Sequence, residues 1–210
     1  MPSYKLYYFQ SRGTAELARL VFKQAGVDFE DIRYKGEEWP QHKSEMPLGA
    51  MPVLEVDGRK ICQSLAIARY LAKEFGLFGS NNMEAFVIDE LFEIFAEIMN
   101  NHLWKIFYEE DENKKAELAE TFKKDSAAKY LNLIEKRLKE NTSGSGFYVG
   151  SEVTVGDLLL YNSMYANRKW LGQFSVDVYE GRPLLEEHFK LVGVLPNIAK
   201  WVQERPETAF

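Results

Sequence analysis

Strand and helix signals alternate over the first part of the chain, and only helical patterns follow them. Runs rich in aromatic and β-branched residues, typical of strands, occur at residues 4–9, 28–34, 52–56 and 59–62. A helical apolar stripe covers residues 15–25 between the first two runs, and another begins at Ser64 after the last one. The order strand, helix, strand, loop, strand, strand, helix predicts a small α/β domain.

Residues that begin and end elements support this assignment. Pro52 has no N–H to donate to a sheet, so we expect it at the start of the third strand. Asp57 and Gly58 are a strong signal for a two-residue hairpin turn. Ser64 precedes the last apolar stripe as an N-cap does, and Gly76 follows it. Ser64 is therefore expected at the N-terminus of a helix.

The sequence pattern changes near residue 77, where a short stretch rich in Gly, Ser and Asn is typical of a linker. We therefore expect an α/β domain over residues 1–79 and an all-helical domain over residues 80–210. The expected helices of the second domain cover 83–109, 114–140, a segment that begins at a capping box of Thr154 and Asp157, 183–192 and 197–204.

Composition excludes several kinds of protein. The net charge is −6 and no stretch concentrates lysine and arginine, which argues against nucleic-acid binding. The single cysteine, Cys62, allows no intrachain disulfide, and His42, His102 and His188 lack metal-ligand spacing, so no metal is expected. No apolar run is long enough to span a membrane. The N-terminus is strand-like and has no leader, so we expect a cytoplasmic protein.

Seven strings resemble one family in their order and spacing. They are YKLYYF with Tyr8, RGTAE at 12–16, EWP at 38–40, AMPVLEVDG at 50–58, QSLAIARYLA at 63–72, the late VTVGDLL, and the terminal RPETAF. The chain resembles the cytosolic glutathione transferases, in particular the sigma class, which includes glutathione-dependent prostaglandin D synthases. The resemblance covers essentially the whole chain. It implies a thioredoxin-like N-terminal domain, an all-helical C-terminal domain, glutathione as co-substrate and a homodimer.

The resemblance also implies roles for individual residues. Tyr8 contacts the glutathione sulfur, and Trp39 and Lys43 hold the glycine carboxylate. Met51 pairs its backbone with the cysteinyl part, beside a cis Pro52. The γ-glutamyl end is taken by Gln63, by Ser64 and by Glu97 of the partner subunit. The residues expected to line the pocket for the electrophile are Phe9, Thr14, Met99, Trp104 and Phe210.

Physical chemistry supports two of these assignments. A helix N-terminus at Ser64 presents unpaired N–H groups and about half a positive charge, which suits a carboxylate. The pKa of a free thiol is about 8.5, and lowering this pKa by about two units requires about 2.7 kcal/mol of preference for the thiolate. One hydrogen bond to a charged acceptor supplies about 1.5–3 kcal/mol, so the hydroxyl of Tyr8 could be nearly sufficient.

The residues by themselves leave structural alternatives open. Ser64 can be a plain N-cap and Tyr8 an ordinary strand aromatic. Lysines such as Lys43 are most often solvated, and tryptophans such as Trp39 are most often part of a core. An acidic helix face that includes Glu97 can equally be a solvated one.

Two departures from the resemblance bear on activity. Thr14 stands where the prostaglandin-isomerising relatives have an arginine, and Glu93, Ala96 and Glu97 stand where they have three aspartates. The leading hypothesis is a glutathione transferase that conjugates small apolar electrophiles. Alternatives are a weakly catalytic binding protein for haem-like or other large apolar anions, a prostaglandin isomerase and a crystallin-like structural protein. A thiol–disulfide oxidoreductase is disfavoured because the first strand–helix turn has no cysteine.

Overall fold

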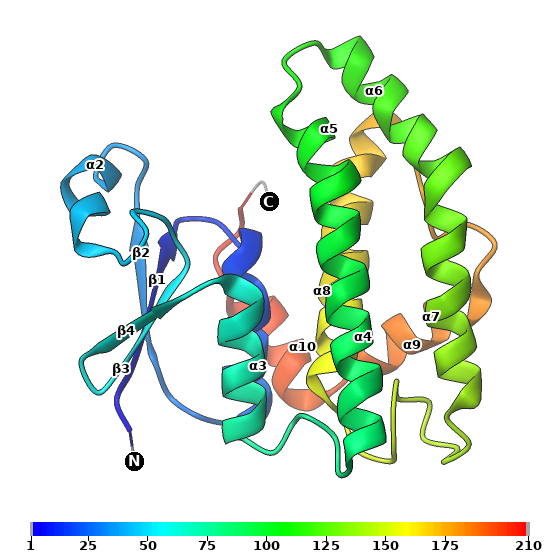
Figure 1. Cartoon of the computed structure of the whole chain (residues 1–210), viewed down its shortest axis with the longest axis horizontal. Coiled ribbons are helices and arrows are strands. Elements are labelled where there is room, and N and C mark those ends of the chain that lie inside the picture. Colours follow the sequence, from blue (N-terminus) through cyan, green and yellow to red (C-terminus); the bar gives the residue numbers. More distant parts are fainter. Residues whose placement is uncertain (1, 209–210) are drawn as a thin grey trace. The chain divides into compact units, whose positions relative to one another are not determined.

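The computed structural model describes residues 2–208. They divide into two compact units (Figure 1). The first unit comprises the residues up to Leu77 together with those from Val194 onward, and the second is Phe78–Gly193. The sequence pattern placed everything after residue 79 in the helical domain, whereas the last helix packs within the first unit.

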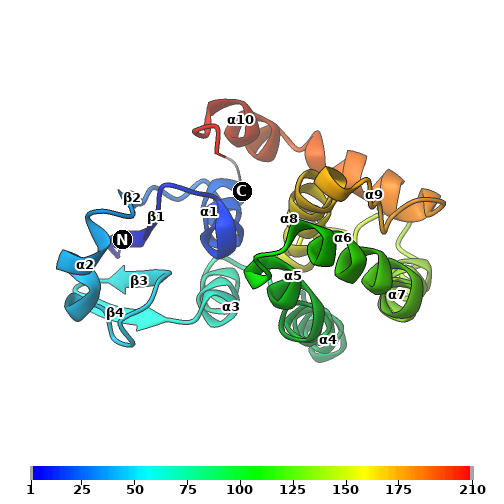
Figure 2. The ribbon, with the colours of Figure 1, turned by 90° about the horizontal axis from the view of Figure 1, so that it is seen from above.

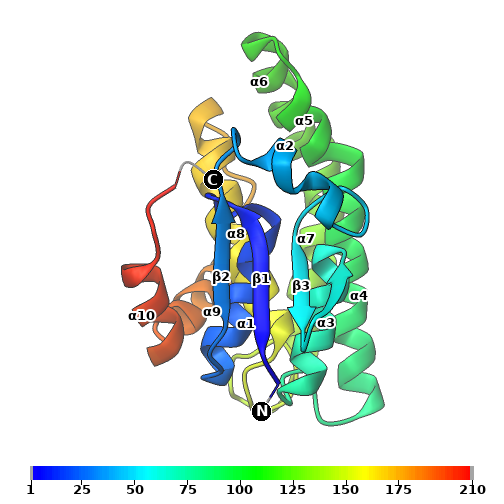
Figure 3. The same ribbon diagram turned by 90° about the vertical axis from the view of Figure 1, so that its left-hand side faces the viewer.

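The first unit contains a four-stranded mixed sheet in the order β2-β1-β3-β4 (Figure 3). Strand β1 (Tyr4–Phe9) runs parallel to β2 (Glu30–Tyr34) and antiparallel to β3 (Val53–Val56). Strand β4 (Arg59–Cys62) completes the sheet beside β3. All four expected strands are present, and the topology is that of a thioredoxin-like α/β domain.

Turn chemistry explains the hairpin between β3 and β4. Asp57 and Gly58 both have positive φ, 47° and 85° respectively. Two successive positive φ angles are the requirement of a type I′ turn, whose twist matches that of the flanking strands. The hairpin prediction is therefore confirmed, and it fixes the register that pairs Val53 with Cys62.

Helices cover both faces of the sheet (Figure 2). Helix α1 (Glu16–Ala25) and helix α3 (Ser64–Glu74) pack against each other on one face. The short helix α2 (Trp39–His42) lies on the opposite side, in a segment that the sequence predicts as a loop. Helix α1 is preceded by a 3₁₀ turn, Gly13–Ala15, and α2 is followed by another, Lys43–Glu45.

Helix α10 (Pro196–Glu204) joins this unit through a buried carboxylate on α1. The side chain of Glu16 is fully buried and accepts hydrogen bonds from Trp201 Nε1 and Arg205 Nη1, each at 2.8 Å. A buried carboxylate needs such donors, because its desolvation is otherwise costly. The amphipathic pattern of α10 predicted a helix but could not identify the surface that it covers.

The second unit is entirely helical over its described length. Its helices are α4 (Asn82–Ile98), α5 (Trp104–Tyr108), α6 (Glu112–Thr121), α7 (Ala128–Glu140), α8 (Val155–Leu171) and α9 (Pro183–Gly193), with a 3₁₀ turn at Gly172–Phe174. Each of the two long predicted helices contains a π-helical segment, Met99–Leu103 in the first and Phe122–Ala127 in the second. Among the helices described here, none has the length and apolarity that crossing a membrane requires.

The capping box at the start of α8 is confirmed. Asp157 is fully buried, and its carboxylate accepts hydrogen bonds from the Thr154 N–H at 2.7 Å and hydroxyl at 2.8 Å. It also accepts the Tyr148 N–H at 2.6 Å and lies 2.9 Å from His188 Nε2. One carboxylate thus ties the start of α8 to the preceding loop and to α9.

We expect Asp157→Ala to cost about 3–5 kcal/mol of unfolding free energy, because several buried donors lose their acceptor. The control is Asp111→Ala, which removes an exposed N-cap carboxylate from α6 and should cost about 1 kcal/mol. Urea unfolding of both variants measures the difference. Equal small losses would mean that the buried contacts of Asp157 contribute no more than an ordinary cap.

Candidate functional site

The sheet register brings the expected glutathione residues of the first unit to one edge. Tyr7 pairs with Val53, and Val53 pairs with Cys62. Tyr8 follows Tyr7, Pro52 precedes Val53 and Gln63 follows Cys62, so all three lie just beyond these last pairs. The end of β1, the start of β3 and the end of β4 therefore meet at the same edge of the sheet.

Tyr8 lies on the face of the sheet that α1 and α3 cover, and its hydroxyl reaches the turn that precedes α1. Its phenol oxygen accepts hydrogen bonds from the Thr14 N–H and from Thr14 Oγ1, each at 3.2 Å. A hydroxyl has one proton to donate and two lone pairs. With both Thr14 donors on the oxygen, the Tyr8 proton remains available for a further acceptor.

Gly13 makes this approach possible. Its φ is +39°, and a Cβ built at this position would lie 2.4 Å from the Tyr8 hydroxyl oxygen. Only a residue without a side chain allows the phenol to sit against the backbone here. The string RGTAE belongs to the family resemblance, but nothing in the sequence predicts that Gly13 and Thr14 contact Tyr8.

Met51 and Pro52, two expected site residues, lie in the segment directly before β3. The peptide bond between them is cis, as the resemblance implied. Pro52 is buried, and the half-buried Met51 packs against a small apolar cluster that includes Tyr7 and Val53. Trp39, the first residue of α2, packs against the same cluster.

Gln63 and Ser64 begin helix α3, but their positions differ from the expected ones. Ser64 is the first helical residue, and the N-cap is Gln63, whose side chain makes no capping hydrogen bond. The interpretation of Ser64 as the N-cap is therefore wrong. Gln63 has φ +77° and ψ 107°, a region that non-glycine residues rarely adopt and that is typical of functional sites.

The N-terminus of α3 is electrostatically suited to an anion. The N–H groups in the first turn of a helix have no intrahelical acceptor, and the helix dipole adds positive potential there. The first backbone bond across this turn runs from the Ile67 N–H to the Gln63 carbonyl at 2.9 Å. The half-buried Ser64 hydroxyl and the exposed Gln63 side chain lie at this same helix start.

Trp39 and Lys43 come from α2 and the turn after it. The Trp39 ring lies 5.6 Å from the Phe9 ring in an edge-to-face arrangement. Lys43 is exposed, and its aliphatic stem runs beside Gly49, where Cε would lie 3.4 Å from a Cβ. Both side chains thus belong to the segment that covers the sheet opposite α1 and α3.

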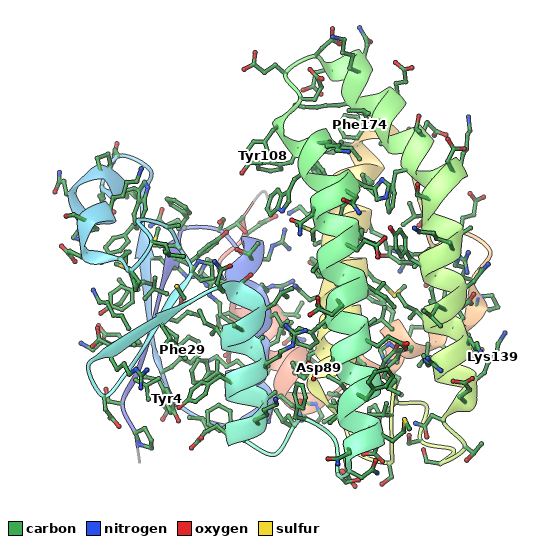
Figure 4. The ribbon with its side chains drawn as sticks, viewed as in Figure 1. Tyr4, Phe29, Asp89, Tyr108, Lys139 and Phe174 are labelled. Carbon is green, nitrogen blue, oxygen red and sulfur yellow. The ribbon has the colours of Figure 1, made fainter. Side chains whose placement is uncertain are left out.

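The other expected pocket residues lie in the helical unit. Met99 begins the first π-helical segment, and Trp104 begins α5. The Trp104 ring packs against Phe107 and stacks with Tyr108, with ring centroids 5.7 Å apart in each case. Tyr108, at the outer end of α5, is 72% exposed (Figure 4). Phe107 and Tyr108 were not among the expected pocket residues, and Phe210 lies outside the described residues.

Glu97 already has partners within its own chain. Its carboxylate accepts a hydrogen bond from the Tyr130 hydroxyl at 2.7 Å and lies 3.4 Å from Lys129 Nζ. The Tyr130 hydrogen bond is the main reason that the pKa of Glu97 is lowered. The side chain is still about half exposed. Within residues 2–208, no three histidine, cysteine or carboxylate side chains converge as a metal site requires.

Comparisons with known proteins identify the family of the chain. Residues 3–73 match the family model of the glutathione S-transferase N-terminal domain, and residues 98–205 match that of the C-terminal domain. Glutathione S-transferase 1 of Ascaris suum is 40% identical over the full length of both chains. S-crystallin SL11 of Nototodarus sloanii and hematopoietic prostaglandin D synthase of Gallus gallus are each 36% identical, again over both full lengths.

Solved structures agree with this assignment. A Nu-class transferase of Haemonchus contortus has a TM-score of 0.88 at 36% identity, with all of both chains covered. A sigma-class transferase of Fasciola hepatica has a TM-score of 0.87 at 30% identity, covering 100% of this chain and 99% of that one. The chain therefore belongs to the glutathione S-transferases, enzymes that use glutathione as co-substrate, and residues 3–73 of its first unit are their thioredoxin-like N-terminal domain.

Proposed function

We propose that the protein conjugates glutathione to small apolar electrophiles and that Tyr8 stabilises the attacking thiolate. The observation that carries this proposal is the pair of Thr14 donors on the phenol oxygen. They leave the Tyr8 proton to be donated to a sulfur anion. Donation to an anion is worth about 1.5–3 kcal/mol, most of what a thiol needs to ionise at neutral pH. Tyr8 remains protonated throughout and acts as a donor.

The rest of the tripeptide is assigned to the same edge of the sheet. The γ-glutamyl carboxylate binds at the N-terminus of α3, where Ser64 and Gln63 lie. The backbone of Met51 pairs with the cysteinyl part as an added strand does. Trp39 and Lys43 take the glycine carboxylate, the lysine through its charge and the tryptophan through its indole N–H.

The electrophile is assigned to apolar and aromatic walls. The residues concerned are those that the resemblance implies, Phe9, Thr14, Met99, Trp104 and Phe210. Aromatic surfaces favour flat, apolar substrates. Thr14 has no positive charge, so a specialised prostaglandin isomerase is a weaker candidate than a general conjugating enzyme of cytoplasmic detoxification. A screen of aryl halides, unsaturated carbonyls and hydroperoxides distinguishes these activities from simple binding of large apolar anions.

We infer a sigma-class homodimer in which Glu97 of the partner subunit reaches the γ-glutamyl ammonium. Large apolar side chains support an assembly of this kind, since Met83 and Phe86 on α4 are 69% and 56% exposed. Leu48, in the first unit, is 64% exposed. Met83 and Phe86 are three residues apart and so lie on one face of α4, and exposed apolar side chains on one face favour burial against a partner. Glu97, about half exposed on α4, keeps carboxylate surface for such a contact.

Tyr8→Phe should leave glutathione affinity nearly unchanged and reduce conjugation by roughly 10- to 150-fold, the rate equivalent of one hydrogen bond to an anion. The pKa of the bound thiol should rise. Tyr7→Phe is the matched control: its hydroxyl donates to Glu55 at 2.9 Å, on the other face of the same strand, so the rate should persist. Assays with a chromogenic aryl halide decide, and full activity of the Tyr8 variant at neutral pH refutes the assignment.

Gly13→Ala should lower both stability and activity, because the new methyl group meets the Tyr8 hydroxyl. Gly26→Ala is the control: its φ is +67°, but no atom lies within 4 Å of the added Cβ. It should cost about 1 kcal/mol and leave the rate intact. Thermal unfolding and conjugation rates are compared for both variants. Similar activity in the two would show that the phenol tolerates displacement.

Ser64→Ala should weaken glutathione binding several-fold with little loss of stability, because Ser64 is not the N-cap of α3. Asn81→Ala removes a true N-cap, whose side chain accepts from the Met83 and Glu84 N–H groups at 3.0 Å. That control should cost about 1 kcal/mol and leave affinity unchanged. Calorimetric titration with glutathione tests both. A large fall in melting temperature for Ser64→Ala without a change in affinity leaves only a structural role.

The shared site can be tested in a heterodimer of Tyr8→Phe and Glu97→Ala chains. If Glu97 acts across the interface, one pocket carries both defects and the other carries none. The purified heterodimer should then conjugate with about half the wild-type kcat and an unchanged KM for glutathione, because one pocket keeps both Tyr8 and Glu97. Glu93→Ala in place of Glu97→Ala is the control for loss of acidic charge on α4. If each chain supplies its own Glu97, the only pocket with Tyr8 lacks Glu97, so a KM raised to that of the Glu97→Ala homodimer contradicts the cross-chain role.

A further inference from the structure

A fully buried arginine lies directly behind Tyr8. Arg19, on α1, has no solvent exposure, and its guanidinium carbon lies 5.8 Å from the centre of the Tyr8 ring. That distance is within the range of a cation–π contact. A cation is expensive to bury, so a position this close to the proposed thiolate donor needs a physical reason.

Arg19 holds the loop that positions the Tyr8 hydroxyl. Its Nη1 donates to the Ser11 carbonyl at 2.9 Å and to the Arg12 carbonyl at 3.2 Å. These residues lead directly into Gly13 and Thr14, which surround the phenol oxygen. The same guanidinium therefore touches both the ring of Tyr8 and the backbone that carries its hydrogen-bond donors.

The charges around Arg19 are only partly balanced within this cluster. Arg19 contacts Glu16 at 3.2 Å and Asp31 at 3.1 Å. Glu16 also accepts from Arg205, and Asp31 also accepts from Arg33 at 2.8 Å. Three guanidinium groups thus surround two carboxylates. Within the described part of the chain, Arg19 Nη2 makes no hydrogen bond.

We propose that Arg19 is a positioning residue of the conjugation site: it fixes the loop from Ser11 to Thr14 around the Tyr8 hydroxyl, and its buried charge favours the thiolate of bound glutathione. This inference rests on the proposed role of Tyr8. A charge buried in protein acts over on the order of 10 Å, because screening by solvent is weak there. Glu16 opposes this effect, since its negative charge lies against the same guanidinium.

The proposal predicts shifts of opposite sign for two neighbouring variants. Removing the cation in Arg19→Gln should raise the pKa of the bound thiol by about one unit, as expected for a buried charge on the order of 10 Å away. Removing the anion in Glu16→Gln should lower that pKa. A purely structural role predicts no such reversal, because both substitutions disrupt the same cluster.

The experiment measures thiolate absorbance of the glutathione complex as a function of pH, with KM for glutathione and melting temperature for each variant. Arg19→Lys keeps the charge and should largely retain the low thiol pKa. Arg33→Gln is the matched control, since Arg33 shares Asp31 with Arg19 but contacts neither the loop carbonyls nor the Tyr8 ring in the described contacts. In Arg33→Gln, the pKa of the bound glutathione thiol should change by less than it does in Arg19→Gln. A lower melting temperature in any of these variants does not contradict the proposal.

Tyr8→Phe in the same assay separates this inference from the proposed function. If Tyr8→Phe does not raise the thiol pKa, the proposed role of Tyr8 fails. If it does, while Arg19→Gln and Glu16→Gln both raise the pKa or both leave it unchanged, the role of Arg19 is overturned. If Arg19→Gln does not fold, Arg19→Lys and Glu16→Gln decide: a retained low pKa in the first and a lowered pKa in the second support the proposal, and any other pair rejects it.

Discussion

The antiparallel pairing of β3 with β1 is the constraint on which the site of the first unit depends. It sets Tyr7 against Val53, and the hairpin with β4 then sets Val53 against Cys62. A slip of one residue would turn every side chain of β3 to the other face of the sheet. Leu54 would leave the core, where it has no solvent exposure. Core packing therefore also fixes which residues meet at the edge where β1 ends, so a packing requirement positions the chemistry.

Two helix starts lie at that edge, and they differ in the donors that they present. The turn before α1 points the Thr14 N–H at the Tyr8 oxygen, so in the proposed site its polarity acts on the ligand through the phenol. The start of α3 has no such intermediary, because the Gln63 side chain makes no capping hydrogen bond. First-turn N–H groups of α3 can therefore face a ligand directly. The two arrangements suit a thiolate that needs one directed donor and a carboxylate that accepts several.

The sequence predicted elements well wherever the signal was local. The hairpin at Asp57, the capping box at Asp157 and the four strands in their order along the chain were all present as expected. Features that depend on contacts between distant residues could not be predicted in this way. The attachment of α10 to the first unit rests on Glu16, which no periodicity could reveal. Ser64 is a good N-cap residue by type, yet the backbone places the cap at Gln63, whose φ of +77° a non-glycine residue rarely adopts.

The candidate site shows the same division between residues known by type and residues known by contact. The resemblance selected Tyr8 and Ser64, whose hydroxyls can donate to an anion, although their residue types alone left structural roles open. Arg19 could not be recognised, since an arginine on an amphipathic helix is usually solvated. Its burial follows from Asp31 on a neighbouring strand and from two loop carbonyls, none of which can be found by reading along α1. The chemistry of a ligand limits which residue types can contact it. Only the fold limits which residue types can orient those contacts. The second kind therefore emerges only when the tertiary contacts are known.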